Sequence, residues 1–209
     1  MNKGKLTIVG SLTSPFVRVV RTVCEELQLP YDMDLTVFFA KQDEAAKEHL
    51  SQHNPLMRVP VLIDGEKHIL DSRIILSYLL KHPDAKPLTD FRADFPRGLE
   101  DENRLSVLYG IVDAGVLYFI MRNLHPEVKP DTGYLVQSQR RIRQGLEWLD
   151  KDKELGEGFG IPELVLLCGL EWFKKREVVE WTGYSHLRAV HARYHERPSL
   201  VKTCIPENA

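Results

Sequence analysis

The chain lacks features that mark several classes of protein. It has only three cysteines in 209 residues and no Cys-x-x-Cys pair, which argues against a disulfide framework and against zinc fingers. Its formal net charge is −2, so no strong field favours a nucleic-acid backbone or an anionic membrane. Its uncharged apolar runs, such as residues 164–170, are far shorter than the ~20 residues that cross a bilayer, and its start leads into no secretory core. We therefore expect a cytoplasmic protein with neither a nucleic-acid nor a membrane partner.

About the first eighty residues alternate short strand-like and helix-like segments. Asp64-Gly65 is a tight-turn signal between two runs rich in branched apolar residues, which predicts a hairpin. Apolar residues at helical spacing predict helices before and after these runs. The predicted order is strand, helix, strand, helix, strand, strand, helix, over residues 6–9, 16–27, 31–37, 43–52, 59–63, 68–70 and 72–80.

The composition changes between residues 82 and 90, where prolines and polar side chains are typical of a linker. No convincing strand pattern follows, and four stretches show helical periodicity: 99–124, 132–149, 162–179 and 185–196. The sequence thus predicts two domains, an α+β domain followed by an all-α domain. We expect the first domain at 1–82, the linker at 83–93 and the helical domain at 94–209.

Ser14-Pro15 lies where the loop after the first strand meets the first helix. Serine is a preferred N-cap and proline a preferred first helical residue, so the pair can be a helix start and nothing more. The same helix terminus also offers free amide donors and a partial positive charge to an anion. A hydroxyl there can donate a hydrogen bond to a bound thiolate. The residues alone leave both interpretations open.

Two further dipeptides lie at predicted element boundaries. Val59-Pro60 opens a strand of the hairpin, where proline is tolerated, and a cis peptide there would turn the backbone of Val59 outward, toward an extended peptide ligand. Asp71-Ser72 opens the third helix, where both residues are good caps. Alternatively, Ser72 and the helix terminus bind a carboxylate while Asp71 accepts hydrogen bonds from an ammonium. The second interpretation makes Asp71-Ser72 a holder for an amino-acid head group.

In order and spacing, these segments resemble the N-terminal domain of glutathione transferases, which is a thioredoxin-like fold. The segments are Ser14-Pro15-Phe16-Val17-Arg18 and residues 54–62 and 70–75. The resemblance continues in residues 139–146 and in Arg197-Pro198-Ser199. It implies the glutathione transferase fold, with a thioredoxin-like βαβαββα domain followed by an all-α domain. It also implies a homodimer, in which the N-terminal domain of one subunit packs on the helical domain of the other.

The resemblance also implies a glutathione site. Ser14 corresponds to the residue that stabilises the glutathione thiolate, and a serine there favours a transferase or isomerase over a thiol-disulfide reductase. Thr13 is a neighbouring hydroxyl that we place behind Ser14. Val59 corresponds to the residue whose backbone pairs with the cysteinyl part of glutathione, and Pro60 is its cis-proline. Asp71 and Ser72 correspond to the clamp for the γ-glutamyl part. Arg58 and Lys41 are candidates for binding the glycine carboxylate. Many relatives carry Glu or Gln at the Asp71 position.

By the same resemblance, a small hydrophobic electrophile would bind between the domains, against the helix at 99–124. Polar and aromatic side chains that could orient it there are Tyr109, Asp113, Tyr118 and Arg122. We therefore expect a glutathione transferase that acts in detoxification. The alternatives are a non-catalytic glutathione-binding or regulatory module and a glutathione-dependent isomerase or peroxidase.

Two further expectations concern metal and folding. We expect no metal cofactor, because the four histidines considered, His125, His186, His191 and His195, form no helical pair with a nearby carboxylate. In place of the Ser/Thr-x-x-Asp capping box of glutathione transferases, the chain has Gly160-Ile161-Pro162-Glu163. This departure predicts a helix start weakened by ~0.5–1 kcal/mol.

Overall fold

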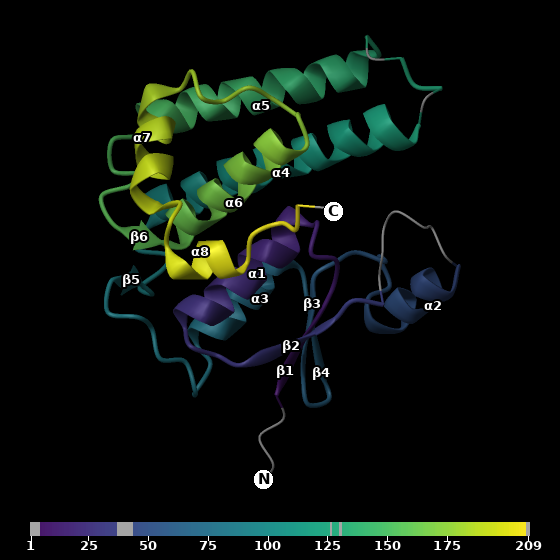
Figure 1. The fold of residues 1–209 in the computed structure, drawn as a ribbon, viewed down its shortest axis with the longest axis vertical. Helices are drawn as coiled ribbons and strands as arrows, with labels where there is room; N and C mark the ends of the chain where they lie inside the picture. Colours follow the sequence, from purple (N-terminus) through teal and green to yellow (C-terminus); the bar gives the residue numbers. More distant parts are fainter. Residues whose placement is uncertain (1–4, 37–43, 126, 130, 208–209) are drawn as a thin grey trace. The chain divides into compact units, whose positions relative to one another are not determined.

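The structure, a computed structural model (Figure 1), describes residues 5–36, 44–125, 127–129 and 131–207. Its contacts divide the chain into two units. Unit 1 comprises Met1–Phe91 together with Arg197–Ala209, and unit 2 comprises Arg92–Glu196. The contacts thus group the end of the chain with unit 1. The domain bounds expected from the sequence, 1–82, 83–93 and 94–209, stay a prediction.

Unit 1 contains a four-stranded mixed sheet in the order β2-β1-β3-β4. β1 and β2 are parallel, whereas β3 is antiparallel to both β1 and β4. Its elements follow the predicted order, which confirms the thioredoxin-like βαβαββα arrangement. They are β1 (Leu6–Val9), α1 (Pro15–Glu26), β2 (Tyr31–Asp34), α2 (Glu44–His53), β3 (Val61–Asp64), β4 (Lys67–Leu70) and α3 (Ser72–Leu80).

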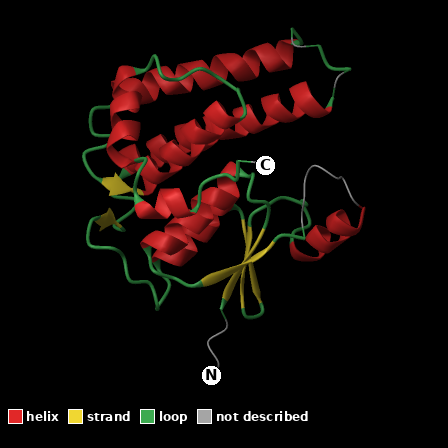
Figure 2. Cartoon of the chain, viewed as in Figure 1, coloured by secondary structure: helices red, strands yellow, loops and turns green. Residues whose placement is uncertain are grey.

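Helices cover both faces of this sheet, with α1 and α3 on one face and α2 on the other (Figure 2). Because side chains alternate along a strand, each central strand buries residues on both faces. Val9 lies opposite Val61, and the two pack with Leu50 of α2. Their neighbours Ile8 and Leu62 are also paired and fully buried, toward α1 and α3. The central strands therefore present apolar side chains to both faces of the sheet where they pair at these residues.

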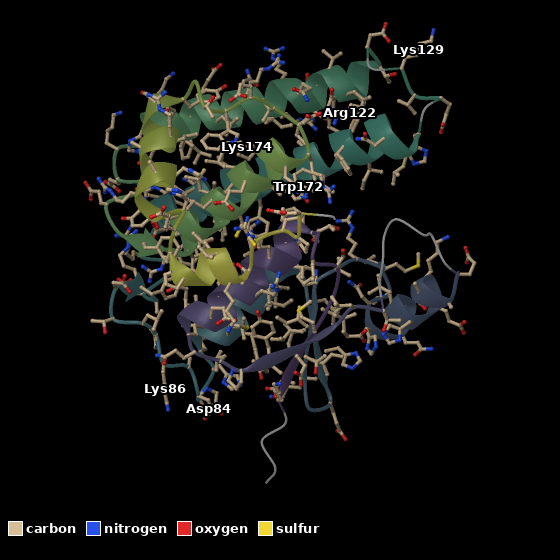
Figure 3. The ribbon with its side chains drawn as sticks, viewed as in Figure 1. Asp84, Lys86, Arg122, Lys129, Trp172 and Lys174 are labelled. Atoms are coloured by element: carbon tan, nitrogen blue, oxygen red, sulfur yellow. The ribbon has the colours of Figure 1, made fainter. Side chains whose placement is uncertain are left out.

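The predicted linker is bonded to the C-terminal end of α1. The amide of Lys86 donates to the carbonyl of Leu27 at 2.8 Å, and the amide of Leu88 donates to the carbonyl of Glu26 at 2.9 Å. Figure 3 labels Asp84 and Lys86 in this segment. The segment between α3 and the end of unit 1 is thus held by backbone hydrogen bonds.

Unit 2 is built on four helices among its described residues, and α4 packs against α5 and α6. The helices are α4 (Leu99–Leu124), α5 (Gly133–Lys151), α6 (Ile161–Lys175) and α7 (Ser185–Tyr194). Two strands of two residues each, β5 (Phe91–Arg92) and β6 (Phe159–Gly160), were not predicted, because they are too short to show alternation. The last predicted helix, 185–196, ends at Tyr194, and α8 (Pro198–Lys202) follows and lies along α1 in unit 1.

By length and composition alone, α4 could cross a membrane, and it is the one described helix that could. It contains no uninterrupted apolar run of that length, because charged residues interrupt its sequence. Its buried side chains, among them Leu105, Leu108 and Val112, pack in the interior of unit 2. We therefore assign α4 as the core helix of unit 2.

Candidate functional site

The sheet register brings the three N-terminal motifs to one end of unit 1. Val61 of β3 lies opposite Val9 of β1 and opposite Leu70 of β4. The chain leaves β1 and β4, and enters β3, at these three residues. Three segments therefore lie at the same end of the sheet: the Val59-Pro60 pair, the Asp71-Ser72 pair and the loop that carries Ser14. Segments up to sixty residues apart in sequence become neighbours in this way.

Ser14 is the N-cap of α1. Its Oγ accepts a hydrogen bond from the amide of Val17 at 3.3 Å, and its carbonyl accepts from the amide of Arg18 at 3.1 Å. A serine hydroxyl has one donor and two acceptor sites. Capping uses an acceptor site and leaves the hydroxyl hydrogen for another partner. The two interpretations of Ser14 are thus compatible in one geometry.

The other hydroxyls of this loop bond to each other. Thr13 Oγ1 and Ser11 Oγ are 2.8 Å apart, and the amide of Thr13 donates to Ser11 Oγ at 3.2 Å. Ser11 is buried. This arrangement favours Ser14 over Thr13 as the hydroxyl that faces a ligand, and the role of either residue stays a prediction.

Gly10 lets the loop pass close to both α1 and Val59. A Cβ atom at Gly10 would lie 2.5 Å from Cγ2 of Val17 and 3.4 Å from Cβ of Val59. The first of these distances is impossible without a shift, so a side chain at this position would push the first turn of α1 outward. The close approach keeps Val59 and the start of α1 against the same stretch of backbone.

The Val59-Pro60 peptide is cis, as the resemblance implied. Asn54 braces the preceding loop, because its Nδ2 donates to the carbonyl of Arg58 at 2.8 Å and its Oδ1 accepts from the amide of Leu56 at 2.9 Å. Val59 is half-buried and Arg58 is exposed. The contacts of Val59 and Arg58 with a peptide ligand stay predictions.

Asp71 is the N-cap of α3, and Ser72 is its first residue. One carboxylate oxygen of Asp71 accepts from the amide of Arg73 at 2.8 Å, so the other oxygen is available to a cation. Asp71 has φ 67°, in the left-handed region that few residues other than Gly, Asn and Asp adopt readily. Its side chain is exposed, whereas Ser72 is buried. Strained backbone of this kind is common at ligand sites, which supports a binding role for Asp71.

Lys41 and Cys24 are two further residues that bear on the site. Lys41 lies outside the described residues. The Cys24 thiol is fully buried inside α1, and burial raises its pKa far above the usual range. A thiol in this environment stays protonated and is a poor nucleophile. The serine at the N-terminus of α1, and not this cysteine, is therefore the polar group with access to a ligand.

The four candidates for the second substrate lie in two different environments on α4. Tyr109 is 6% exposed, and Asp113, one turn further along, is exposed. Tyr118 and Arg122 together line a cavity of ≈710 Å³ within unit 2. The structure thus brings Tyr118 and Arg122 together, and the assignment of all four to substrate binding stays a prediction.

Arg122 is also bonded to the end of α6. Its guanidinium donates to the carbonyls of Glu177 at 2.9 Å and Arg176 at 3.0 Å, and it lies 5.5 Å above the ring of Tyr118. Figure 3 labels Arg122 near the C-terminal end of α4, and Lys174 on α6. Arg122 therefore shapes this cavity by joining two of its walls.

Comparison with known proteins identifies the class of unit 1. Residues 8–87 match the family model of the glutathione S-transferase N-terminal domain. This range contains all three motifs at the end of the sheet. A search of curated protein sequences found no match.

Solved structures match over nearly the whole chain. A glutathione S-transferase from Methylobacillus flagellatus, crystallised with glutathione bound, is 26% identical, with a TM-score of 0.79 over 96% of this chain and 100% of that chain. A glutathione transferase family member from Pseudomonas fluorescens, also with bound glutathione, is 28% identical, with a TM-score of 0.77 over 96% and 99%. A glutathione S-transferase from Methylobacterium radiotolerans, 24% identical with a TM-score of 0.77 over 97% and 95%, shares the fold.

These findings confirm the resemblance to the glutathione S-transferase family and the fold class that it implied. Residues 8–87 of unit 1 match the glutathione S-transferase N-terminal domain, and the chain has the fold of the bacterial glutathione transferases to which it is similar.

One group of polar side chains in unit 1 was not expected from the sequence. The expectation of no metal rested on four histidines of the helical half, whereas His49 and His53 lie one turn apart on α2. The spacing H-x-x-x-H was the available signal. Asp34 of β2 lies beside them, and local sequence gives no sign of this contact.

Proposed function

We propose that the chain is a glutathione transferase in which the Ser14 hydroxyl donates a hydrogen bond to the glutathione thiolate. The observation that carries the proposal is the register of the sheet, which gathers Ser14, Val59-Pro60 and Asp71-Ser72 at one end of unit 1. The crystallised glutathione complexes of the two bacterial relatives support glutathione as the ligand.

In this proposal, each part of the site holds one part of glutathione. The backbone of Val59 pairs with the cysteinyl residue, and Asp71 accepts hydrogen bonds from the γ-glutamyl ammonium. Ser72 and the N-terminus of α3 bind the γ-glutamyl carboxylate. Arg58 and Lys41 are the cations proposed for the glycine carboxylate, and Thr13 is a second hydroxyl beside the sulfur.

The energy that the mechanism needs is modest. A free thiol has a pKa near ~8.5 and is only a few per cent ionised at neutral pH. Lowering that pKa by about two corresponds to ~2.7 kcal/mol of preferential stabilisation of the thiolate. A hydrogen bond to a charged group contributes ~1.5–3 kcal/mol, and the N-terminus of α1 adds a favourable dipole. One hydroxyl at this helix terminus is therefore sufficient.

Replacing Ser14 by Ala tests the proposed role directly. We expect turnover with a chlorinated nitroaromatic substrate to fall by about 10-fold or more, since the thiolate loses its donor. We expect the affinity for glutathione, measured by calorimetry, to stay within a few-fold, because the γ-glutamyl and backbone contacts remain. An unchanged turnover would reject the assignment.

Ser14→Asp and Thr13→Ala serve as controls. Aspartate caps a helix as well as serine does, so Ser14→Asp keeps α1 intact while placing a negative charge beside the sulfur. If Ser14 acts only as a cap, Ser14→Asp retains full activity, whereas a thiolate donor at this position predicts a loss at least as large as that of Ser14→Ala. Thr13→Ala should have the smaller effect.

The same assays separate the alternative functions. Glutathione binding without turnover across several electrophiles would favour a non-catalytic glutathione-binding or regulatory module. Turnover of a peroxide, or isomerisation without consumption of glutathione, would favour a peroxidase or isomerase, since a stabilised thiolate serves all of these reactions.

The second substrate in this proposal is a small hydrophobic electrophile oriented by Tyr109, Asp113, Tyr118 and Arg122, in keeping with a detoxifying enzyme. We further propose that the protein is cytoplasmic and forms a homodimer. Sedimentation equilibrium of the full chain tests the dimer, and a mass near that of a single chain, 24.1 kDa, would contradict it.

A further inference from the structure

Two histidines of α2 face an aspartate at the end of β2. His49 and His53 are four residues apart, so their side chains project from the same side of the helix. Their ring centroids are 4.9 Å apart, and Nε2 of His49 lies 2.8 Å from Oδ2 of Asp34. One nitrogen or oxygen atom from each of these three side chains lies within 4.8 Å of the other two.

The carboxylate of Asp34 is held in a fixed orientation. Its Oδ1 accepts hydrogen bonds from the amide of Thr36 at 3.0 Å and from Thr36 Oγ1 at 2.6 Å. The backbone carbonyl of Asp34 accepts from the amide of Gly10 at 3.0 Å, which ties the end of β2 to the end of β1. One carboxylate oxygen is thus occupied, and Oδ2 is presented to the histidines. Metal-binding carboxylates are oriented in the same way by hydrogen bonds to their other oxygen.

The ring nitrogen Nδ1 of His53 is buried, and no hydrogen-bond partner for it lies among the described residues. A buried polar nitrogen that makes no hydrogen bond is costly, and a metal ion is one partner that removes this cost. The side chains of His49 and Asp34 are 30% and 23% exposed, so an ion can reach the group from solvent.

We propose that Asp34, His49 and His53 bind one divalent transition-metal ion, Zn²⁺ foremost, with water in the remaining coordination position. Two imidazole nitrogens and one carboxylate oxygen are a set that zinc uses, whereas Ca²⁺ and Mg²⁺ prefer oxygen ligands alone. None of these three residues is among those proposed above to contact glutathione, and the existence of the metal site does not depend on transferase activity.

The geometry requires only a small adjustment. Zinc bonds of ~2.0–2.2 Å in a tetrahedral site place neighbouring ligand atoms roughly 3.4 Å apart. Atoms that lie as far as 4.8 Å from one another must approach by about 1.4 Å, whereas Nε2 of His49 and Oδ2 of Asp34, now 2.8 Å apart, must separate by about 0.6 Å. Half-buried side chains can make this movement by small rotations, and the ion then replaces the hydrogen bond between His49 and Asp34.

Calorimetric titration of the full, tag-free chain with ZnCl₂, in the absence of glutathione, tests the proposal. We expect one Zn²⁺ per chain and no heat with CaCl₂ or MgCl₂. His49→Gln, His53→Gln and Asp34→Asn should each weaken zinc binding by about 100-fold or more, because even the loss of an outer-shell partner costs ~10–100-fold. Circular dichroism without metal checks that each variant is folded.

The chain offers a matched control on α7. His191 and His195 have the same four-residue spacing, and their rings stack 5.1 Å apart. Nε2 of His191 lies 3.3 Å from Oε1 of Glu171, so the expectation that this pair has no carboxylate nearby is wrong. Among the described residues, however, no third ligand atom completes a set with the pair at the separation found for Asp34, His49 and His53. His191→Gln and His195→Gln should therefore leave zinc affinity unchanged. His68→Gln, which alters the ring 4.9 Å from that of His53, should change it by less than ~10-fold.

Electron paramagnetic resonance of the Cu²⁺-loaded chain provides a second readout. We expect hyperfine coupling to two imidazole nitrogens in the parent chain and to one in His49→Gln or His53→Gln. Absence of zinc binding, or binding that survives His53→Gln and Asp34→Asn but is lost in His191→Gln, would overturn the proposal.

Discussion

At the scale of single residues, the three cysteines show how environment sets the reactivity of a thiol. Cys24 and Cys168 are buried in helices, whereas Cys204 is exposed near the end of the chain. Burial disfavours the charged thiolate, and it raises the pKa of Cys24 accordingly. Access to solvent singles out Cys204.

We therefore expect the native chain to react with one equivalent of an aromatic disulfide reagent, at Cys204. Absorbance of the released thiolate measures the stoichiometry, and denaturant should expose the two remaining thiols. In Cys204→Ser, native labelling should disappear. Rapid labelling of Cys24 in the native chain would contradict its assignment as a protonated core thiol.

At the scale of elements, α6 shows how a helix start is secured without a side-chain cap. Gly160, the N-cap, has no side chain, as the sequence indicated. The buried carboxylate of Glu163 instead accepts from the amides of Gly160 and Gly156, each at 2.9 Å, and from Nη2 of Arg92 at 3.1 Å. The missing cap is visible in the sequence, whereas the partnership of Glu163 with Arg92 and Gly156 arises only in the fold. A Cβ at Gly160 would lie 3.2 Å from the carbonyl oxygen of Arg92, so a serine would not fit without adjustment.

The start of α4 depends on the carboxylate of Asp101, whose contribution to the stability of the fold varies with pH. Asp101 is 3% exposed and accepts hydrogen bonds from the amide and guanidinium of Arg97 and from Nη1 of Arg104. The bonds from the Arg97 side chain are the main cause that lowers the pKa of Asp101 to about 2 from 3.8. When the pKa of a carboxyl group is lower in the folded chain than in the unfolded chain, its charged form stabilises the fold. This stabilisation is complete above the pKa of the unfolded state, and it is lost as the pH falls toward the pKa of the folded state.

We therefore expect Asp101→Asn to lower the free energy of unfolding by ~2 kcal/mol at neutral pH. The difference from the parent chain should shrink progressively between about pH 4 and about pH 2. Urea unfolding followed by circular dichroism at several pH values measures both quantities. Glu102→Gln, an exposed neighbour, should change stability by less than ~0.5 kcal/mol. A constant difference across this pH range would contradict the assignment.

The elements were predictable where their signal is local. The seven elements from β1 to α3 and the helix at 99–124 follow from apolar spacing within a short window, and the structure has them in the predicted order. The motifs of the candidate site were found because Ser14, Pro60 and Asp71 mark element boundaries. The hydrogen bond between His49 and Asp34 could not be predicted, because β2 and α2 are brought together by the fold and leave no pattern in sequence.

At the scale of the whole molecule, the end of the chain completes unit 1. The guanidinium of Arg197 donates to both carboxylate oxygens of Glu26, at 2.6 and 2.7 Å, and also to Asp90. Ser199 donates to Glu26 as well. Glu26 is 0% exposed and Arg197 is 10% exposed at the side chain, so this ion pair is shielded from water. The sequence motif Arg197-Pro198-Ser199 was recognised, but its partner 171 residues earlier was not.

Replacing Arg197 by Met should therefore destabilise unit 1 by ~3–5 kcal/mol, because it leaves the carboxylate of Glu26 buried without its main partner. The double variant Glu26→Gln/Arg197→Met should cost less than the sum of the two single variants, since it also removes the uncompensated charge. Lys202→Met is the matched control, because it breaks an ion pair with Glu25 in which Lys202 is 68% exposed, and such pairs contribute only ~0–1 kcal/mol. All three tryptophans lie in unit 2, so circular dichroism, and not tryptophan fluorescence, must be used to follow the urea unfolding of unit 1. If Arg197→Met cost no more than Lys202→Met, the end of the chain would not be part of the stable core of unit 1.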